Sequence, residues 1–556
     1  MQKASTPASG WRGWASLDGV VGGVGVFVGA LALFALQSLA VSLVLGRDSE
    51  DYAIHGWELF EREPLFPRLM LARTPVTGVL IDAFYAAGGA IGLEVGLGLL
   101  FAAAVTGWVA AARQWGRKPA VAMFVLLAVV PTYGLFFHRV SSDAVFAAVL
   151  ALVAYLAVRM ARRPSVACAF ALGASVALLI LTRPSGQPFL ILALLPLGLV
   201  LPWARRARLS LMVAVAALVL VAGWAVSNQV RYGERTVAHG GKSGIPLYRV
   251  FVIDPRVETA NGPATRAVVR AVQERLLPIE PYRSYGFDVD ELLAARSVWV
   301  LDDIVNAVES EFGAEHGSEL LFRAGVEGVR AAPATYARGV GLAFTGLLLL
   351  PYSPGLAVRG DGGATAVITD TPMGTAGTTR RLPVGAAGQP SVWAQAMIKS
   401  WALESSARYH VRGGLEPVDD AIWPRLERRQ LTWTSPADAA RYEVLRTRLH
   451  GFVDDFSAGD RRPREARALR IAGLLLPAGG FWLLVAVAFC LRSRPAGIWA
   501  PALVALASVL VLLTTALAFP PHPDYALPFV PSFALLALAV LAGRSALRNE
   551  AYPRSP

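Results

Sequence analysis

Cysteine is nearly absent from this chain, whose 556 residues include only Cys168 and Cys490. Both lie inside apolar stretches, so the sequence excludes a framework of disulfide bonds. No stretch interleaves basic and aromatic side chains, so the net charge of +12 does not indicate a nucleic-acid partner. The sequence also lacks an internal repeat of the kind that indicates a transporter built from duplicated halves.

A signal for cleavage after the first apolar stretch is missing as well. This stretch runs from Gly19 to Leu45, which is too long for the apolar region of a secretory signal, and no convincing cleavage site follows it. We therefore expect it to remain in the mature protein as a helix.

Apolar residues are abundant: they make up 55% of the chain, and the mean hydropathy is +0.49. They fall in blocks of about 20 residues, long enough for a helix to cross a hydrocarbon core of roughly 30 Å. The sequence therefore predicts a polytopic α-helical membrane protein with about ten transmembrane helices. The candidate spans are Gly19–Leu45, Ala90–Ala111, Pro119–Phe137, Ala144–Val158, Val166–Leu181, Pro188–Leu201, Leu209–Ser227, Ala468–Cys490, Ile498–Phe519 and Ala526–Leu541.

Basic residues in alternate loops predict the orientation. They cluster before the first span, between the second and third, after the fourth and after the sixth. Because loops rich in Lys and Arg stay in the cytoplasm, we expect a cytoplasmic N-terminus in a bacterial plasma membrane, with the remaining loops on the outer face. The residues concerned are Lys3, Arg12, Arg113, Arg117, Lys118, Arg159, Arg162, Arg163, Arg205, Arg206 and Arg208.

The predicted spans divide the chain into three parts. Residues 1–227 form an N-terminal transmembrane module, 228–467 a large extracytoplasmic domain of mixed α/β structure, and 468–556 the C-terminal transmembrane helices. An apolar segment near 339–352 holds about 14 residues, which suits an interfacial segment better than a span. If it did cross, everything after it would invert, and the arginines between Arg461 and Arg470 favour that alternative.

On the predicted topology, polar side chains collect at the outer mouths of the helices. A charged pocket there would suit a polar headgroup whose lipid tail stays in the bilayer. The candidate site residues are Asp48, Glu50, Asp51, Tyr52, Arg68, Arg73, His138, Arg139, Asp143, Arg183, His522 and Tyr525.

Five short motifs follow this topology in order: "DSEDY" from Asp48, "SSDAVF" from Ser141, "LTRPSG" from Leu181, "WAVSNQVRYGERTVAHGG" from Trp224 and "HPDYALPFVP" from His522. Together they resemble the integral-membrane glycosyltransferases of the GT-C superfamily, and within it the bacterial protein O-mannosyltransferase and aminoarabinose transferase type. That type carries Asp-Glu-x-x-Tyr after its first helix. Ser49 stands here in place of the Glu, so Glu50 and Asp51 both remain candidates for that role.

The resemblance implies a sugar donor carried on polyprenyl phosphate and an acceptor outside the cytoplasm, either a glycan, a lipid or a protein. Asp48 matches the family's acidic position, and a carboxylate there could take the acceptor's proton in a single inverting displacement. Arg68, Arg73, Arg139 and Arg183 could bind the departing phosphate, with His138 and His522 as hydrogen-bond donors. This scheme requires no cofactor; the alternative is a divalent cation held by Asp48, Asp51 and Asp143.

Structural explanations remain open for each motif. The acidic cluster could be a solvated helix end, Tyr52 an interfacial aromatic residue, "SSD" an N-cap, and Arg183 a snorkelling side chain. The stretch from Arg461 to Arg470 could anchor the chain on anionic headgroups. A secondary transporter, a non-catalytic envelope assembly protein and an enzyme for another lipid-linked headgroup remain alternative functions. None of these motifs specifies the sugar, the acceptor or the oligomeric state.

Overall fold

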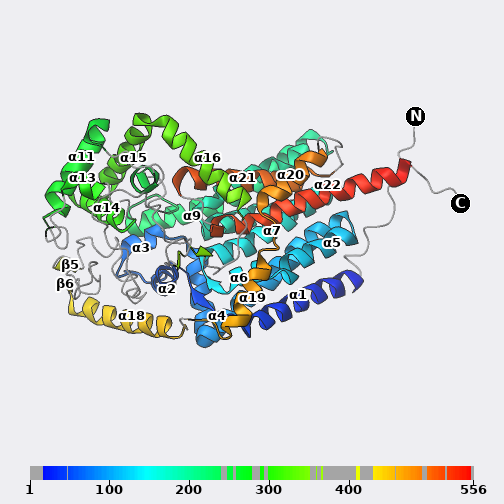
Figure 1. Cartoon of the computed structure of the whole chain (residues 1–556), viewed down its shortest axis with the longest axis horizontal. Helices are drawn as coiled ribbons and strands as arrows, with labels where there is room; N and C mark the ends of the chain where they lie inside the picture. The colour runs from blue at the N-terminus through cyan, green and yellow to red at the C-terminus, as the bar shows by residue number, and fades with distance from the viewer. Residues whose placement is uncertain are drawn as a thin grey trace.

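The computed structural model describes residues 17–46, 48–238, 247–253, 258–278, 283, 288–293, 298–350, 358–359, 365–366, 409–412, 430–456, 459–490, 497–519 and 523–551. Most of these residues are helical. Figure 1 shows an elongated molecule in which α1 begins and α22 ends at one extremity, while a smaller helical group lies at the other.

The N-terminal part is a bundle of apolar helices with short connections. Its elements are α1 (Leu17–Ser38), β1 (Val44–Leu45), α2 (Ser49–Glu58), α3 (Pro67–Ala72), α4 (Pro75–Ala112), η2 (Arg113–Trp115), α5 (Arg117–Phe124), η3 (Val125–Val129), α6 (Pro131–Phe137), β2 (Arg139–Val140), α7 (Ser142–Arg162), α8 (Val166–Thr182), η4 (Pro184–Gly198) and α9 (Trp203–Tyr232). Helix α4 packs against α1 and α7, and α8 packs against α7 and α9.

Local sequence explains where many of these helices begin. Proline at the first helical position opens α3, α4 and α6, where its missing N–H group would have no intrahelical partner in any case. The serine hydroxyls at the N-caps of α7 and α8 each accept a backbone hydrogen bond, from Ala144 at 3.3 Å and from Cys168 at 3.1 Å.

Two glycines interrupt α4 close to the residue at which the predicted span begins. Gly89 has φ +61°, a left-handed conformation that glycine adopts without strain, and Gly88 beside it is extended. The predicted span, Ala90–Ala111, begins just after this break. The preceding half, which starts at Pro75, lies against α2.

The C-terminal part completes the bundle with α20 (Gly479–Cys490), α21 (Trp499–Ala518), η10 (Pro523–Tyr525), η11 (Leu527–Phe529) and α22 (Val530–Ala551). Helix α21 packs between η4 and α22, and α20 packs along α22. A single hydrophobic core therefore joins segments from both ends of the sequence.

Among the described residues, four helices are long and apolar enough to cross a membrane: Pro75–Trp115, Ser142–Arg162, Trp203–Tyr232 and Trp499–Ala518. The pair Arg117–Val129 and Pro131–Phe137, bent by 53°, adds a fifth if it forms one span. Shorter apolar helices cover Gly22–Ser38, Val166–Thr182, Pro184–Gly198, Gly479–Cys490 and Leu527–Gly543. The sequence-based count of about ten spans remains a prediction.

The segment predicted as an outer domain is mainly helical in its described residues. It contains η5 (Arg249–Ile253), η6 (Thr259–Asn261), α11 (Pro263–Ala271), η7 (Val272–Leu276), α13 (Val289–Leu293), α14 (Val298–Phe312), α15 (Ala314–Ala331), α16 (Pro333–Leu349), α18 (Pro436–Asp454) and α19 (Pro463–Gly473). Helices α11, α14 and α15 share a second hydrophobic core, and they gather at the upper left of Figure 1.

Two small antiparallel sheets also lie in this segment: β3 (Val358–Arg359) with β4 (Thr365–Ala366), and β5 (Tyr409–Arg412) with β6 (Gln430–Trp433). The prediction of a mixed α/β domain stays a prediction. Helix α16 covers most of the apolar segment near 339–352, and it packs beside α20 and α21.

Candidate active site

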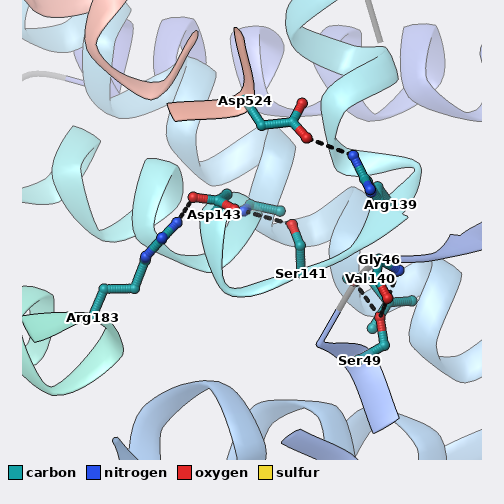
Figure 2. A network of polar contacts seen from close by, with 9 residues as sticks. Gly46, Ser49, Arg139, Val140, Ser141, Asp143, Arg183 and Asp524 are labelled. Atoms are coloured by element: carbon teal, nitrogen blue, oxygen red, sulfur yellow. Dashed lines mark hydrogen bonds and ion pairs between the residues drawn. The ribbon is translucent and has the colours of Figure 1, made fainter. Parts of the chain in front are cut away.

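A two-residue parallel bridge brings the first two outer loops of the predicted topology together. Strands β1 and β2 pair Val44 with Arg139 and Leu45 with Val140. The Ser49 hydroxyl then donates to the Val140 carbonyl at 2.6 Å, and Gly46 N–H donates to that hydroxyl at 2.6 Å (Figure 2). A Cβ on Gly46 would lie 2.5 Å from the Val140 carbonyl oxygen, so this approach requires glycine. The loop that carries Asp48 is thereby fixed beside the loop that carries Asp143.

The acidic cluster does not form a solvated helix end. Asp51 is only 1% exposed, and its carboxylate accepts a hydrogen bond from Arg73 at 2.6 Å. Arg73 also lies 3.2 Å from the carboxylate of Asp48, and its guanidinium covers the ring of Tyr52 at 5.1 Å. Burial by itself would lower the pKa of Arg73, but Asp48 and Asp51 raise it well above its usual value. One arginine therefore neutralises two aspartates.

A second aspartate–arginine pair stands at the adjoining helix ends. Asp143 lies in the first turn of α7, two residues after the N-cap Ser141, and Arg183 is the C-cap of α8. Their side chains form an ion pair, as Figure 2 shows. The guanidinium of Arg183 also lies 5.6 Å from the centre of the Tyr525 ring. The N-cap explanation of "SSD" is therefore compatible with a role of Asp143 in the site.

Arg139 forms a third pair, with Asp524, at 2.5 Å. This contact joins β2 to η10, two segments 385 positions apart in the sequence. Because Tyr525 follows Asp524 directly, the pair fixes the loop between α21 and α22 over the ends of α7 and α8 (Figure 2).

The first two pairs line a cavity of about 310 Å³. Its wall carries both charged and aromatic groups, so it suits a ligand that is polar at one end and apolar at the other. The lining residues are Asp48, Arg73, Asp143, Phe146, Arg183, Ser185, Tyr248, Val511, Thr515, Phe519, Tyr525, Pro528 and Phe529. We call the end of the helical bundle that holds this cavity the pocket end.

Five of the residues proposed from sequence line the cavity: Asp48, Arg73, Asp143, Arg183 and Tyr525. Asp51 and Tyr52 do not line the cavity but contact Arg73, which does. Arg139 forms an ion pair with Asp524, the residue before Tyr525.

Of the four remaining candidates, two lie away from the cavity, and for two the side chain or the whole residue lies outside the described residues. Glu50 is buried in α2 and is 1% exposed, and the ring of His138 is buried and stacks on Phe34 at 4.1 Å; neither lines the cavity. The side chain of Arg68, on α3, and the whole of His522 lie outside the described residues.

Sequence reasoning missed the wall that Tyr248, directly before η5, and the C-terminal part of α21 supply. Tyr248 packs on Phe519 with ring centres 5.0 Å apart, and both line the cavity. The next residue, Arg249, is 1% exposed and donates to the Ala516 carbonyl at 2.8 Å. Its positive charge therefore lies at the negative C-terminal end of α21. Tyr336 on α16 donates to the Leu517 carbonyl in the same turn, at 2.9 Å.

The signal for this wall was an arginine and a tyrosine within "LYRVF", a stretch otherwise apolar. Its partners lie some 270 positions further along the chain, so their proximity follows from the fold alone.

The described residues do not contain a group of three or more His, Cys, Asp and Glu side chains placed to hold a metal ion. Asp48, Asp51 and Asp143 each face an arginine. The alternative of a divalent cation shared by these three aspartates stays a prediction.

Fold and site together define an integral membrane protein with a charged cavity at one end of its helical bundle. No family model and no curated protein matches the chain. Two solved structures do match, and both are of ArnT from Cupriavidus metallidurans, a GT-C aminoarabinose transferase.

The structure bound to undecaprenyl phosphate has 16% sequence identity and a TM-score of 0.32, with 97% of this chain and 79% of that chain covered. The apo structure has 15% identity and a TM-score of 0.30, with 96% and 79% covered. These matches are to the type of enzyme that the sequence motifs resemble. At such TM-scores they carry no argument about function, which rests on the site and the motifs.

Proposed function

We propose that this protein is a membrane glycosyltransferase, which moves a sugar from a polyprenyl-phosphate donor to an acceptor outside the cytoplasm. The observation that carries the proposal is the convergence of Asp48 with Arg73 and of Asp143 with Arg183 on one cavity. Its volume of about 310 Å³ is at the lower end of the range for small-molecule sites. It suits one sugar and its phosphate, with the lipid tail lying outside.

The two arginines supply the phosphate end of the site. A guanidinium stays charged and can donate two parallel hydrogen bonds to phosphate oxygens, which stabilises the negative charge that develops on the leaving group. In the structure each arginine is neutralised by aspartate. The phosphodiester of the donor, which carries one negative charge, therefore has to compete with the aspartates for Arg73 and Arg183. Its contact with the arginines strengthens as the sugar–phosphate bond breaks, because the departing polyprenyl phosphate gains a second negative charge.

Asp48 is the best-placed base. Its side chain is 39% exposed and lines the cavity, whereas that of Asp51 is 1% exposed and is held by Arg73. The acceptor oxygen forms a bond to the anomeric carbon and loses its proton to the Asp48 carboxylate. The bond from that carbon to the phosphate oxygen breaks, and its electron pair leaves with polyprenyl phosphate. One displacement of this kind inverts the anomeric carbon.

Phe146, Val511 and Phe529 give the cavity an apolar side, which suits the first isoprenoid units of the carrier. The N-terminus in the cytoplasm and the pocket end outside complete the proposal, because carriers of this type present their sugars at the outer leaflet. In this arrangement the segment 228–467 is the part that selects the acceptor.

A secondary transporter is the main alternative from a different class. Transporters hold their substrates near the middle of the membrane, where helices are broken. The charged groups here lie instead at the N-terminus of α7, the C-terminus of α8 and the loops next to them, which favours an enzyme.

The test is transfer of labelled sugar by the purified protein from a panel of polyprenyl-phosphate donors. Asp48→Asn should lose turnover by a factor of about 10² to 10⁴, the usual contribution of a general base, and should keep its donor affinity and its melting temperature. Glu61→Gln is the matched control, since Glu61 is an exposed carboxylate on the same loop. Activity that survives in Asp48→Asn would rule out Asp48 as the base.

The same assay tests the metal alternative. The proposal expects unchanged turnover after treatment with EDTA, and a loss that Mg²⁺ or Mn²⁺ restores would contradict it. The donor that is consumed identifies the sugar. A wild-type protein that consumes no donor, and instead moves a solute across a vesicle membrane, would replace the proposal with the transporter.

A further inference from the structure

Helix α19, which begins at the end of the predicted outer domain, lies on the bundle at the pocket end. The N–H group of Arg462, its N-cap, donates to the carbonyl of Ala40 at 2.9 Å. Ala466 packs in a small cluster with Ala40, Val41 and Leu135. Residues 40 and 41 come just before β1, the strand that leads to Asp48, so the first turn of α19 is level with the pocket end.

The direction of α19 follows from its second contact with α6. The Thr132 hydroxyl donates to the carbonyl of Gly473, the last residue of α19. Helix α6 runs from Pro131 towards β2 and the pocket end, so Thr132 lies deeper in the bundle than Leu135. Helix α19 therefore runs from the pocket end into the apolar part of the bundle. Figure 1 shows it beside α6, between α4 and α1.

One face of α19 is covered by the bundle and the opposite face is open. Ala466 and Gly473, seven positions apart, are buried. The open face carries Arg464, Arg467 and Ile471, and it continues past the end of the helix through the C-cap Leu474 to Leu475. The intervals from Arg464 to Leu474 are three or four residues, which keeps these side chains on one stripe. Ile471 is 52% exposed and Leu475 is 74% exposed. We call these five residues the α19 stripe.

The stripe changes character along its length. Its two arginines are nearest the pocket end, and its three apolar side chains lie deeper. This order matches a membrane surface, where phosphate groups give way to acyl chains within a few ångströms. A stripe made for water would not place three large apolar side chains together.

The arginines of the stripe differ from Arg461 and Arg470 in having no carboxylate partner among the described residues. Arg461 is paired with Glu94 at 2.8 Å, and Arg470 with Asp460 at 2.6 Å. Within the described part of the chain, neither Arg464 nor Arg467 has an ion-pair or hydrogen-bond partner. Glu465 is exposed on the same turn, but it lies about 100° around the helix from Arg464 and further from Arg467.

We propose that the α19 stripe binds anionic phospholipids of the leaflet at the pocket end. Arg464 and Arg467 contact the lipid phosphates, and Ile471, Leu474 and Leu475 lie among the acyl chains. Charge complementarity selects an anionic headgroup, and the apolar half of the stripe selects a lipid over a soluble phosphate. This site is separate from the cavity, and it does not depend on the glycosyltransferase function.

The experiment measures phosphatidylglycerol binding to the purified full-length chain by native mass spectrometry, with phosphatidylcholine as the neutral lipid. The test variant is Arg464→Gln/Arg467→Gln. The matched control is Arg270→Gln/Arg330→Gln, which removes the same charge from exposed positions on α11 and α15, at the far end of Figure 1. Melting temperatures of all three proteins verify that they are folded.

We expect the test variant to bind phosphatidylglycerol roughly tenfold to thirtyfold more weakly than the wild type, since each arginine near an anionic surface contributes about a factor of five. The control should keep the wild-type affinity for phosphatidylglycerol. All three proteins should bind phosphatidylcholine with the same affinity.

Equal affinity in the test and control variants would overturn the proposal. So would a test variant that keeps its phosphatidylglycerol affinity but no longer binds polyprenyl phosphate, because the stripe would then serve the donor instead. A wild type that does not prefer phosphatidylglycerol to phosphatidylcholine would overturn it as well. None of these results depends on whether sugar transfer is observed.

Discussion

Arginines at the pocket end occur in two contrasting settings. In the cavity, Arg73 and Arg183 each face aspartate, and Arg139 beside it does so too. On the α19 stripe, Arg464 and Arg467 are exposed and face no carboxylate among the described residues. Ion pairs therefore hold the arginines of the cavity in place, whereas the arginines of the stripe are open to the surrounding solvent or lipid.

The contrast shows how one residue type can serve two kinds of phosphate. A reacting phosphate needs donors fixed in advance, and ion pairs to buried aspartates fix them. A membrane surface is fluid, and its phosphates come to the protein, so rigid arginines would bring no advantage there. Pairing also keeps the cavity close to neutral until a ligand replaces the carboxylates.

The largest effect should come from breaking the most buried pair. Arg73→Ala leaves Asp51 as an uncompensated charge with 1% of its side chain exposed, which should lower the free energy of unfolding by about 3 kcal/mol or more. The Arg464→Gln/Arg467→Gln variant should stay within about 0.5 kcal/mol of the wild type. Unfolding in mixed micelles, followed by circular dichroism, measures both.

The double variant Asp51→Asn/Arg73→Met is the control for charge. It removes both partners of the pair, so it should recover much of the lost stability while remaining inactive. If Arg73→Ala were as stable as the wild type, Asp51 would not depend on Arg73, and the contrast between the two settings would fail.

The second pair separates the role of an arginine in turnover from its role in stability. Arg183→Ala should reduce the turnover number by about a hundredfold or more, the usual cost of one donor to a developing anion. Its effect on stability should be smaller than that of Arg73→Ala, because the Asp143 side chain is 19% exposed and keeps contact with water.

Arg183→Lys tests the geometry of that donor. A lysine keeps the charge but loses the paired hydrogen bonds and the planar contact with Tyr525, so turnover should fall part of the way. Kinetics with the donor identified above measure both variants. A lysine variant with full activity would mean that Arg183 contributes its charge alone.

Much of the helical part, and part of the site, could be predicted from sequence. Long apolar runs predict helices because the bilayer leaves the backbone few other ways to satisfy its polar groups. The motifs that begin at Asp48, Ser141 and Leu181 lie at helix ends, so the predicted topology brings them to one face. In the structure, Asp48, Asp143 and Arg183 line one cavity.

The rest could not be predicted because it depends on contacts between distant segments. Periodicity gave no reason to place Tyr248 beside Phe519, or Arg249 at the end of α21. The predicted span begins just after the break in α4, but the helical half before the break, which starts at Pro75, was not predicted. His138 was chosen for its residue type, but the side chain stacks on Phe34 instead of facing the cavity.

The smallest predicted effect concerns Glu58 at the end of α2. Its arginine partner, Arg441, is further away than Arg73 is from Asp51. Arg441 lies 3.5 Å away and is 38% exposed, whereas Arg73 lies 2.6 Å from Asp51. Burial raises the pKa of Glu58 from 4.5 to about 7, despite hydrogen bonds from Leu65 N–H at 3.0 and 3.2 Å. The weaker pairing therefore does not offset the cost of burying this carboxylate.

A carboxyl group whose pKa is raised in the folded state stabilises the fold at low pH. Glu58 keeps its proton in the folded chain between pH 4.5 and about 7 but loses it in the unfolded chain, so stability falls as pH rises through this window. Glu58→Gln stays neutral, so it should match the wild type at pH 4 and exceed its stability at pH 8 by up to about 3 kcal/mol. Glu61→Gln removes an exposed carboxylate three residues further along the chain. The charge of Glu61 is the smallest of the causes that act on the pKa of Glu58, so this variant should change the pH dependence much less. Melting curves at both pH values decide the matter: parallel behaviour of wild type and Glu58→Gln would mean that Arg441 compensates Glu58 as fully as Arg73 compensates Asp51.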